Sequence, residues 1–150
     1  MSSTMRRLKT AAMGAACLGL AATLAFADDR PYTEGPVVNV AGIRTEYGHF
    51  DDYMKFLATT WKDTMEAEKK AGLILSYEVL TVEPRGADDP DVYLVITYKN
   101  WAALDGLDAK TDAMETQVYG TQAKATQAAV DRSKIRRTLG SQTMQVLNLK

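Results

Sequence analysis

The sequence is poor in the side chains that most often bind metals or act as nucleophiles. Its 150 residues include one cysteine, Cys17, and one histidine, His49. Because Cys17 lies in a segment that we expect to be removed, the mature chain would contain no disulfide, no thiol nucleophile and no thiolate metal site. His49 alone cannot supply the three or four convergent ligands of a mononuclear metal site. We therefore expect no bound metal and no cofactor.

Excess positive charge is also absent. The formal net charge is −1, and loss of Arg6, Arg7 and Lys9 with the N-terminal segment would leave 15 Lys and Arg against 19 Asp and Glu, or −4. A protein that binds nucleic acid needs a basic surface that neutralises phosphates. The composition argues against nucleic acid as a partner.

The N-terminal segment is typical of a secretory signal peptide. Three basic residues precede an apolar run, 11–26, that is too short for a comfortable membrane span. The run ends at Ala25-Phe26-Ala27, which has the small-x-small pattern of a signal peptidase site. We expect residues 1–27 to be cleaved and the mature protein to be periplasmic or secreted, with no membrane attachment. Residues 28–36 are polar, contain two prolines and are predicted to form a flexible leader.

The remaining residues, 37–150, are predicted to form one domain. β-branched and aromatic runs predict strands at 37–45, 73–82, 92–98 and 143–149. Apolar residues spaced three and four apart from Phe50 to Met65 predict an amphipathic helix that stops before Gly72. A second, largely helical stretch follows Trp101 and extends toward Gly140, with breaks at Gly106 and Gly120. The order β-α-β-β-α-β predicts a ferredoxin-like α+β fold, in which four antiparallel strands carry both helices on one face.

The third predicted strand, 92–98, is apolar on both faces. Val92, Leu94 and Ile96 lie on one face, and Tyr93 and Val95 lie on the other. A strand of this kind needs cover on both faces, whereas the helices cover only one. A large uncovered apolar face is typically an interaction surface, so we expect a homodimer.

Two passages resemble the dimeric α/β-barrel superfamily: R-T-x-x-G-x-F-D-D-Y from Arg44 to Tyr53, and Y-K-N-W-A-A-L-D from Tyr98 to Asp105. The chain is most similar to small secreted bacterial members of unassigned function. The resemblance implies that two sheets pack face to face and enclose a barrel. The superfamily includes haem-degrading and quinone-forming monooxygenases. Asn39 could match an Asn of the haem-degrading members, but those also use a His near the second helix, and residues 100–142 contain none.

Several polar residues interrupt otherwise apolar strands. Such groups either line a cavity or satisfy one another inside the protein. Arg44 could hold an anionic group of a ligand, although it could equally form an ion pair with Glu78. The residues predicted to bind a ligand are Asn39, Arg44, Tyr77 and Thr97.

His49 stands beside Gly48 and shortly before Asp51 and Asp52. One interpretation is an acid–base residue at the mouth of a pocket. The other, which the missing second ligand favours, is a residue that only begins the first helix.

These features predict an exported small-molecule-binding protein with a pocket inside the barrel. One alternative is a cofactor-free monooxygenase or isomerase of the dimeric α/β-barrel type. A second alternative is a structural or interaction module whose barrel is filled by side chains.

Overall fold

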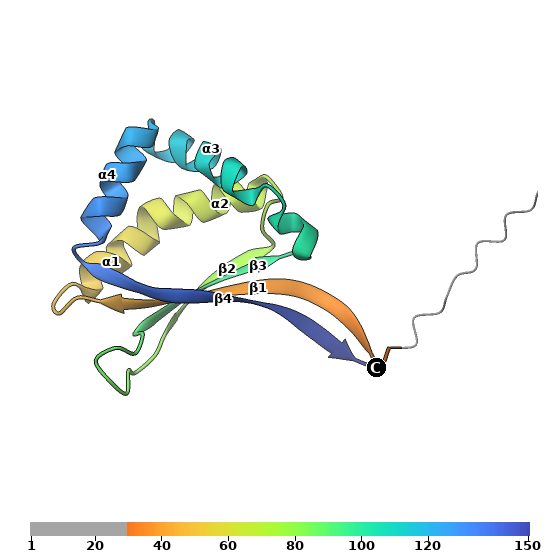
Figure 1. The fold of residues 1–150 in the computed structure, drawn as a ribbon. Coiled ribbons are helices and arrows are strands. Elements are labelled where there is room, and N and C mark those ends of the chain that lie inside the picture. The colour runs from red at the N-terminus through yellow and green to blue at the C-terminus, as the bar shows by residue number, and fades with distance from the viewer. Residues whose placement is uncertain (1–29) are drawn as a thin grey trace, which may run out of the picture.

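The computed structural model of the protein describes residues 30–150, so the predicted signal peptide lies outside the described residues. One antiparallel sheet contains four strands in the order β2-β3-β1-β4. Both helical segments lie on one face of this sheet (Figure 1). This arrangement confirms the predicted ferredoxin-like α+β fold. The strands are β1 (Tyr32–Thr45), β2 (Ser76–Thr81), β3 (Val92–Tyr98) and β4 (Arg136–Leu149).

The first helical segment runs without a break in three parts. These are α1 (Phe50–Phe56), a π-helical segment (Leu57–Trp61) and α2 (Lys62–Lys70). Acidic residues in the first turn of α1 and basic residues in the last turn of α2 complement the helix dipole. The chain then turns at Gly72, whose φ of +74° is favourable for glycine.

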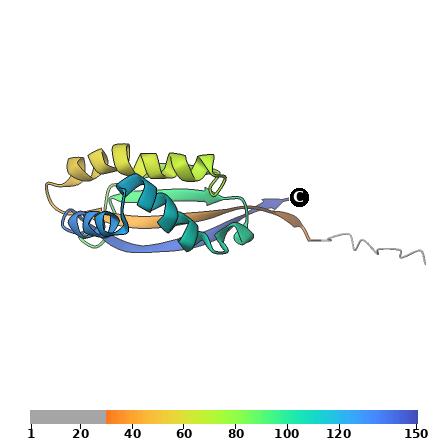
Figure 2. The same ribbon diagram turned by 90° about the horizontal axis from the view of Figure 1, so that it is seen from above.

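The second helical segment is divided into a 3₁₀ turn (Trp101–Leu104), α3 (Leu107–Tyr119) and α4 (Gln122–Arg132). The breaks fall at Gly106 and Gly120, as predicted, and both residues have positive φ. The two helical segments lie next to each other on the same face of the sheet. Seen from above, α1 and α2 run along one edge of the face, and α3 and α4 run along the opposite edge (Figure 2).

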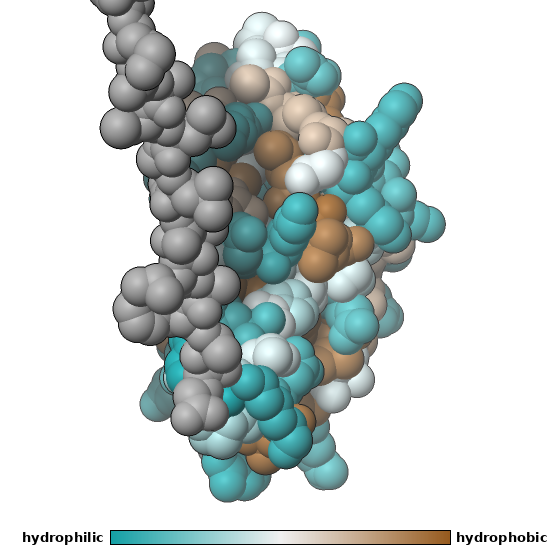
Figure 3. Space-filling model, turned by 90° about the vertical axis from the view of Figure 1, so that its right-hand side faces the viewer, coloured by the Kyte–Doolittle hydropathy of each residue, from teal (hydrophilic) through white to brown (hydrophobic). Residues whose placement is uncertain are grey.

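The core lies between the first helical segment and the two central strands. Val37 and Ile43 of β1, together with Val92 and Tyr98 of β3, are buried against Tyr53, Leu57 and Met65. In contrast, α3 contains no buried residue and α4 only Ala125. The end-on view shows apolar residues, in brown, reaching the surface between polar ones (Figure 3). The second helical segment is therefore less firmly packed than the first, and space remains beneath it.

Two predicted boundaries are wrong. Strand β1 begins at Tyr32, so the predicted leader contains its first part, which pairs with the end of β4. The proline at position 36 is tolerated because it falls where the pairing register shifts, between Glu34 and Val37.

Strand β4 begins at Arg136, within the stretch predicted to be helical. Arg136 pairs with Thr45 of β1, and Gly140 lies inside the strand instead of ending a helix. Pairing with β1 along this edge outweighs the weak helical pattern of the local sequence.

The two faces of the sheet differ in character. Alternation along β1 and β3 directs Val37, Ile43 and Val92 to the helices, and we call this side the helix face. We call the opposite side the open face. Within residues 30–150, no helix covers this face (Figure 1). Its central members are Val38, Val40, Tyr93, Val95 and Met144, as the strand registers require.

Candidate functional site

A cavity of about 200 Å³ lies between the helix face of the sheet and the helices. We call it the helix-side cavity. Aromatic and apolar residues form much of its wall, and charged residues stand at two places on it. Its lining consists of Tyr53, Phe56, Trp61, Thr64, Met65, Glu68, Leu94, Glu115, Tyr119, Arg132 and Arg136.

Two carboxylic acids form one part of the wall. Glu68 of α2 is 4% exposed, and no hydrogen bond or ion pair of its carboxyl group occurs among residues 30–150. Burial, reinforced by the negative charge of Glu115 on α3, raises the pKa of Glu68 to about 7. A carboxyl group with this pKa can exchange a proton near neutral pH, which suits a general acid or base.

Two arginines form another part. The Arg132 guanidinium lies 4.7 Å from the centre of the Phe56 ring, and its Nη1 donates a hydrogen bond of 2.8 Å to the Tyr119 hydroxyl. The Arg136 guanidinium lies 5.6 Å from the centre of the Tyr53 ring. Its Nη1 donates to the Thr138 hydroxyl, whereas its Nε is buried without a partner among the described residues.

The π-helical segment places Trp61 at the cavity. Trp61 packs edge-on against Tyr77 of β2, with 5.3 Å between the ring centres. π-helical turns are rare in proteins and occur frequently at functional sites. Here the segment shifts the helix register directly before the turn that carries Thr64, Met65 and Glu68.

The sequence did not single out Glu68, Glu115, Arg132 or Arg136 as one site. A signal for Glu68 nevertheless exists. Leu57, Trp61 and Met65 mark the apolar stripe of the helix, and position 68 follows at the next three-residue step. A carboxylate on a core-facing stripe indicates a group with a special environment.

The four residues predicted to bind a ligand lie on both faces of the sheet. Asn39 and Tyr77 both lie opposite Ile96 in the sheet. Ile96 packs against the core under the helices, so Asn39 and Tyr77 lie on the helix face as well. Thr97 and Arg44 belong to the open face. The structure therefore does not bring these four side chains into one cavity, and their role as ligand contacts stays a prediction.

Three of these residues have partners within the protein. Asn39 donates a hydrogen bond of 2.8 Å to Thr143, and Tyr77 donates one of 2.6 Å to Glu66. Arg44 donates to the backbone oxygen of Asp89 and is paired across the strands with Arg137, so it does not form the ion pair with Glu78 that the sequence allowed. Much of the polar strand pattern is thus explained by local satisfaction.

His49 occupies the N-cap position of α1, as the sequence predicts. Its side chain does not cap the helix, and its Nδ1 lies 3.1 Å from a carboxylate oxygen of Asp52. The side chains of His49 and Asp52 are 44% and 52% exposed, and His49 is not part of the helix-side cavity. This position agrees with a residue that begins a helix.

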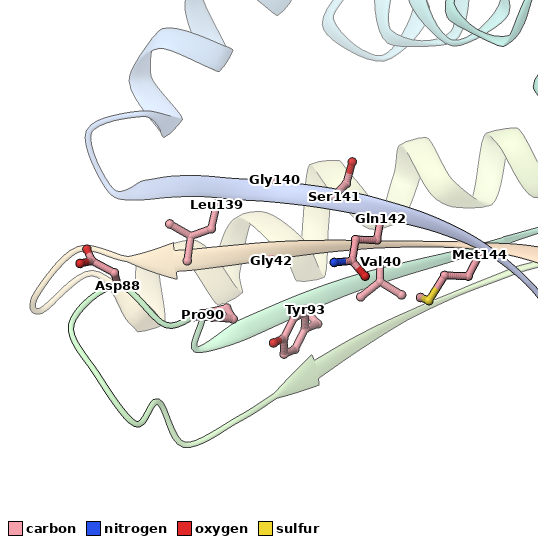
Figure 4. A pocket seen from close by; sticks show the side chains of 10 residues that line it. All are labelled: Val40, Gly42, Asp88, Pro90, Tyr93, Leu139, Gly140, Ser141, Gln142 and Met144. Carbon is pink, nitrogen blue, oxygen red and sulfur yellow. The ribbon is translucent and has the colours of Figure 1, made fainter.

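The open face carries a second, shallower depression of about 440 Å³. Figure 4 shows the side chains of Val40, Tyr93, Gln142 and Met144 pointing away from the helices into this space. Leu139, the extra residue where the β1–β4 register shifts, closes one end.

Two further searches cover residues 30–150 only. No group of three or more His, Cys, Asp or Glu side chains lies close enough to hold a metal ion. None of the helices in this part of the chain is long and apolar enough to cross a membrane.

No protein-family model matches the sequence, and no curated protein is similar to it. Among solved structures, HapK from Hahella chejuensis is 11% identical, with a TM-score of 0.49 over 72% of this chain and 90% of its own. Protein SO0527 from Shewanella oneidensis is 20% identical, with a TM-score of 0.47 over 78% and 96% of the two chains. A dimeric ferredoxin-like protein from an uncultured marine organism is 12% identical, with a TM-score of 0.49 over 79% and 98%. At these identities the similarity concerns the fold, which the strand order establishes independently.

Proposed function

We propose that the protein is a homodimer that binds a small, partly apolar molecule in the helix-side cavity. The main observation that supports this proposal is the different chemistry of the two sheet faces. Arginines, a carboxyl group of raised pKa and aromatic rings converge on the helix face. The centre of the open face presents mainly apolar side chains, for which a second copy of the chain is the simplest cover.

The subunit interface follows from the exposed residues of the open face. Leu80 and Met144 are 48% and 46% exposed, and Val40, Tyr93 and Val95 form a partly exposed patch between them. Burying this patch against its own copy would remove apolar area from water, at about 25 cal/mol per Å². The depression on the open face would then become the interior of the barrel. The sequence predicts a ligand pocket inside the barrel, so the barrel interior is the competing location for the ligand.

Catalysis is the second candidate function. It is favoured by one observation, the raised pKa of the buried Glu68 carboxyl group. In an isomerase or a cofactor-free monooxygenase, this carboxylate would remove a proton from a substrate carbon or oxygen. Simple binding requires no such group, so a Glu68→Gln variant that retains ligand affinity but loses turnover would favour catalysis.

Two tryptophans allow the ligand to be located. Trp61 lines the helix-side cavity, whereas the indole of Trp101 lies elsewhere and donates to Gln145. We expect single-ring probes such as phenol, benzamide and benzoate to shift the indole N–H signal of Trp61 in ¹H–¹⁵N NMR spectra. The Trp101 signal should stay in place and serves as the internal control.

The same spectra can contradict the proposal in two ways. Shifts confined to the Gln142 side-chain amide and the backbone of Val40 and Val95 would place the ligand on the open face. No shift with any probe at millimolar concentration would favour the structural or interaction module.

Export remains part of the proposal. The basic residues before the apolar run, and the Ala25-Phe26-Ala27 pattern, support it. When the full-length chain is expressed in a Gram-negative host, mass spectrometry of the periplasmic fraction should show Asp28 as the N-terminus. A chain that keeps Met1 or carries lipid on Cys17 would refute cleavage at this site.

A further inference from the structure

Arg136 has an unusual combination of burial and missing partners. It is the first residue of β4 and faces the helices, because it pairs with the buried Thr45. Its Nη1 is used by Thr138, but its Nε is buried without a hydrogen bond among residues 30–150. A buried N–H without a partner destabilises the fold, and native proteins rarely leave one without a reason.

The unused part of Arg136 has a definite shape. In a guanidinium group, Nε–H and one N–H of Nη2 point in parallel from the same edge. No hydrogen bond to either atom occurs within the described residues. Two parallel donors of this kind match the two oxygens of a carboxylate, which makes arginine well suited to bidentate binding.

Arg132 does not compete for this role. Its guanidinium contacts the Phe56 and Tyr119 rings, and its Nη1 is bonded to the Tyr119 hydroxyl. It therefore adds positive potential beside Arg136 while holding its own position. Together the two cations favour an anionic group at this end of the cavity.

The size of the cavity and its other walls limit the remainder of the ligand. About 200 Å³ is available, and an apolar cavity of roughly 150 Å³ can hold benzene. Phe56, Trp61 and Leu94 offer contacts for one ring. Glu68 and Glu115 stand on the wall formed by α2 and α3, and their charge would repel a second anionic group there.

We propose that the helix-side cavity binds a single-ring aromatic monocarboxylate, which turns the Arg136 guanidinium so that its carboxylate pairs with the Nε–Nη2 edge, whose Nε is closed to solvent in the unliganded chain. This inference rests on the proposed function and names the ligand class of the same site. Tyr53 of α1, whose ring lies under the Arg136 guanidinium, would support the guanidinium from the helix side. Binding should weaken as pH rises through about 7, because ionised Glu68 adds to the charge of Glu115 and repels the anion. Burial raises the pKa of the Tyr53 and Tyr98 phenols above their usual value of about 10, so neither titrates in this range.

The test compares benzoate with benzamide, its neutral counterpart of nearly the same shape. Affinities are measured at pH 6 and 150 mM salt from the shift of the Trp61 indole signal. We expect wild type to bind benzoate at least tenfold more tightly than benzamide. Arg136→Gln should lower the benzoate affinity to the benzamide level and leave benzamide binding unchanged. Arg136→Lys keeps the positive charge but lacks the two parallel N–H donors, so it should lose most of the preference for benzoate over benzamide.

Arg137→Gln is the matched control. Arg137 is the next residue, but it lies on the open face near Glu46 and Asp88. Its substitution should leave the preference for benzoate intact. An equal loss in the Arg136 and Arg137 variants would show general electrostatic attraction and overturn the inference.

Two other outcomes separate this inference from the proposed function. If benzoate and benzamide bind the cavity equally well, the ligand class is wrong and the binding function stands. If neither probe moves the Trp61 signal, both are wrong. If Arg136→Gln fails to fold, the benzoate and benzamide affinities of wild type and Arg136→Lys still test the inference.

Discussion

Replacing Glu68 with Gln should stabilise the fold at pH 8 by roughly 2–3 kcal/mol, and by almost nothing at pH 4. In the folded chain the pKa of Glu68 lies near 7 instead of 4.5 because the carboxyl group is buried beside Glu115. Below pH 4.5 the folded and unfolded chains both carry the proton, so there is no penalty. Between pH 4.5 and 7 the unfolded chain releases it first, and wild type loses stability as pH rises. Gln carries no charge and removes this loss.

The measurement is urea unfolding of both proteins at one concentration from pH 4 to pH 8. Glu83→Gln, at an exposed loop position, controls for the general loss of one negative charge. A Glu68→Gln effect that is the same at every pH would mean that the carboxyl group is not buried in this way.

Placing a charge at the centre of the open face should break the proposed dimer. Val95 lies in a central strand, opposite Val40 and Glu78. Its face is uncovered in the single chain, so Val95→Asp leaves the monomer folded, with a cost in strand propensity of up to about 1 kcal/mol. In the dimer the carboxylate would be buried without a partner, which costs about 3–5 kcal/mol. The dimer dissociation constant should therefore rise by at least a hundredfold.

Light scattering at micromolar concentration measures this effect. Wild type should have twice the mass of one mature chain, and Val95→Asp should have the mass of a single chain. Val130→Asp is the matched control, since Val130 is 49% exposed on α4, away from the open face. A monomeric wild type, or dissociation by both substitutions, would contradict the proposed interface.

The parts of the fold that the sequence predicts well are those with a strong local pattern. Strand β3 has the predicted bounds, because a run of mostly β-branched and aromatic residues is confined by Asp91 and Lys99. The breaks at Gly106 and Gly120 are also correct, since a positive φ strongly favours glycine. The first part of β4 was missed because an exposed edge strand does not need to alternate apolar and polar residues.

The candidate site depends on contacts that local patterns do not contain. Burial of Glu68 requires α3 to lie beside α2, and Glu115 comes from a helix 47 positions later in the chain. Arg136 faces the cavity only because it belongs to a strand, whereas the sequence pattern placed it at a helix end. Asn39 and Tyr77 were correctly identified as polar groups in apolar strands. Which face they occupy was set by the register with β3.

The central claim is that the two faces of the sheet have separate roles, with dimerisation on the open face and ligand binding on the helix face. A crystal structure of the mature protein grown with benzoate tests both parts in one measurement. The account predicts two chains packed through Val40, Tyr93 and Val95, with benzoate in each helix-side cavity and its carboxylate on Arg136. Benzoate between the two sheets, beside Tyr93 and Gln142, would contradict the account, as would a solvent-exposed open face.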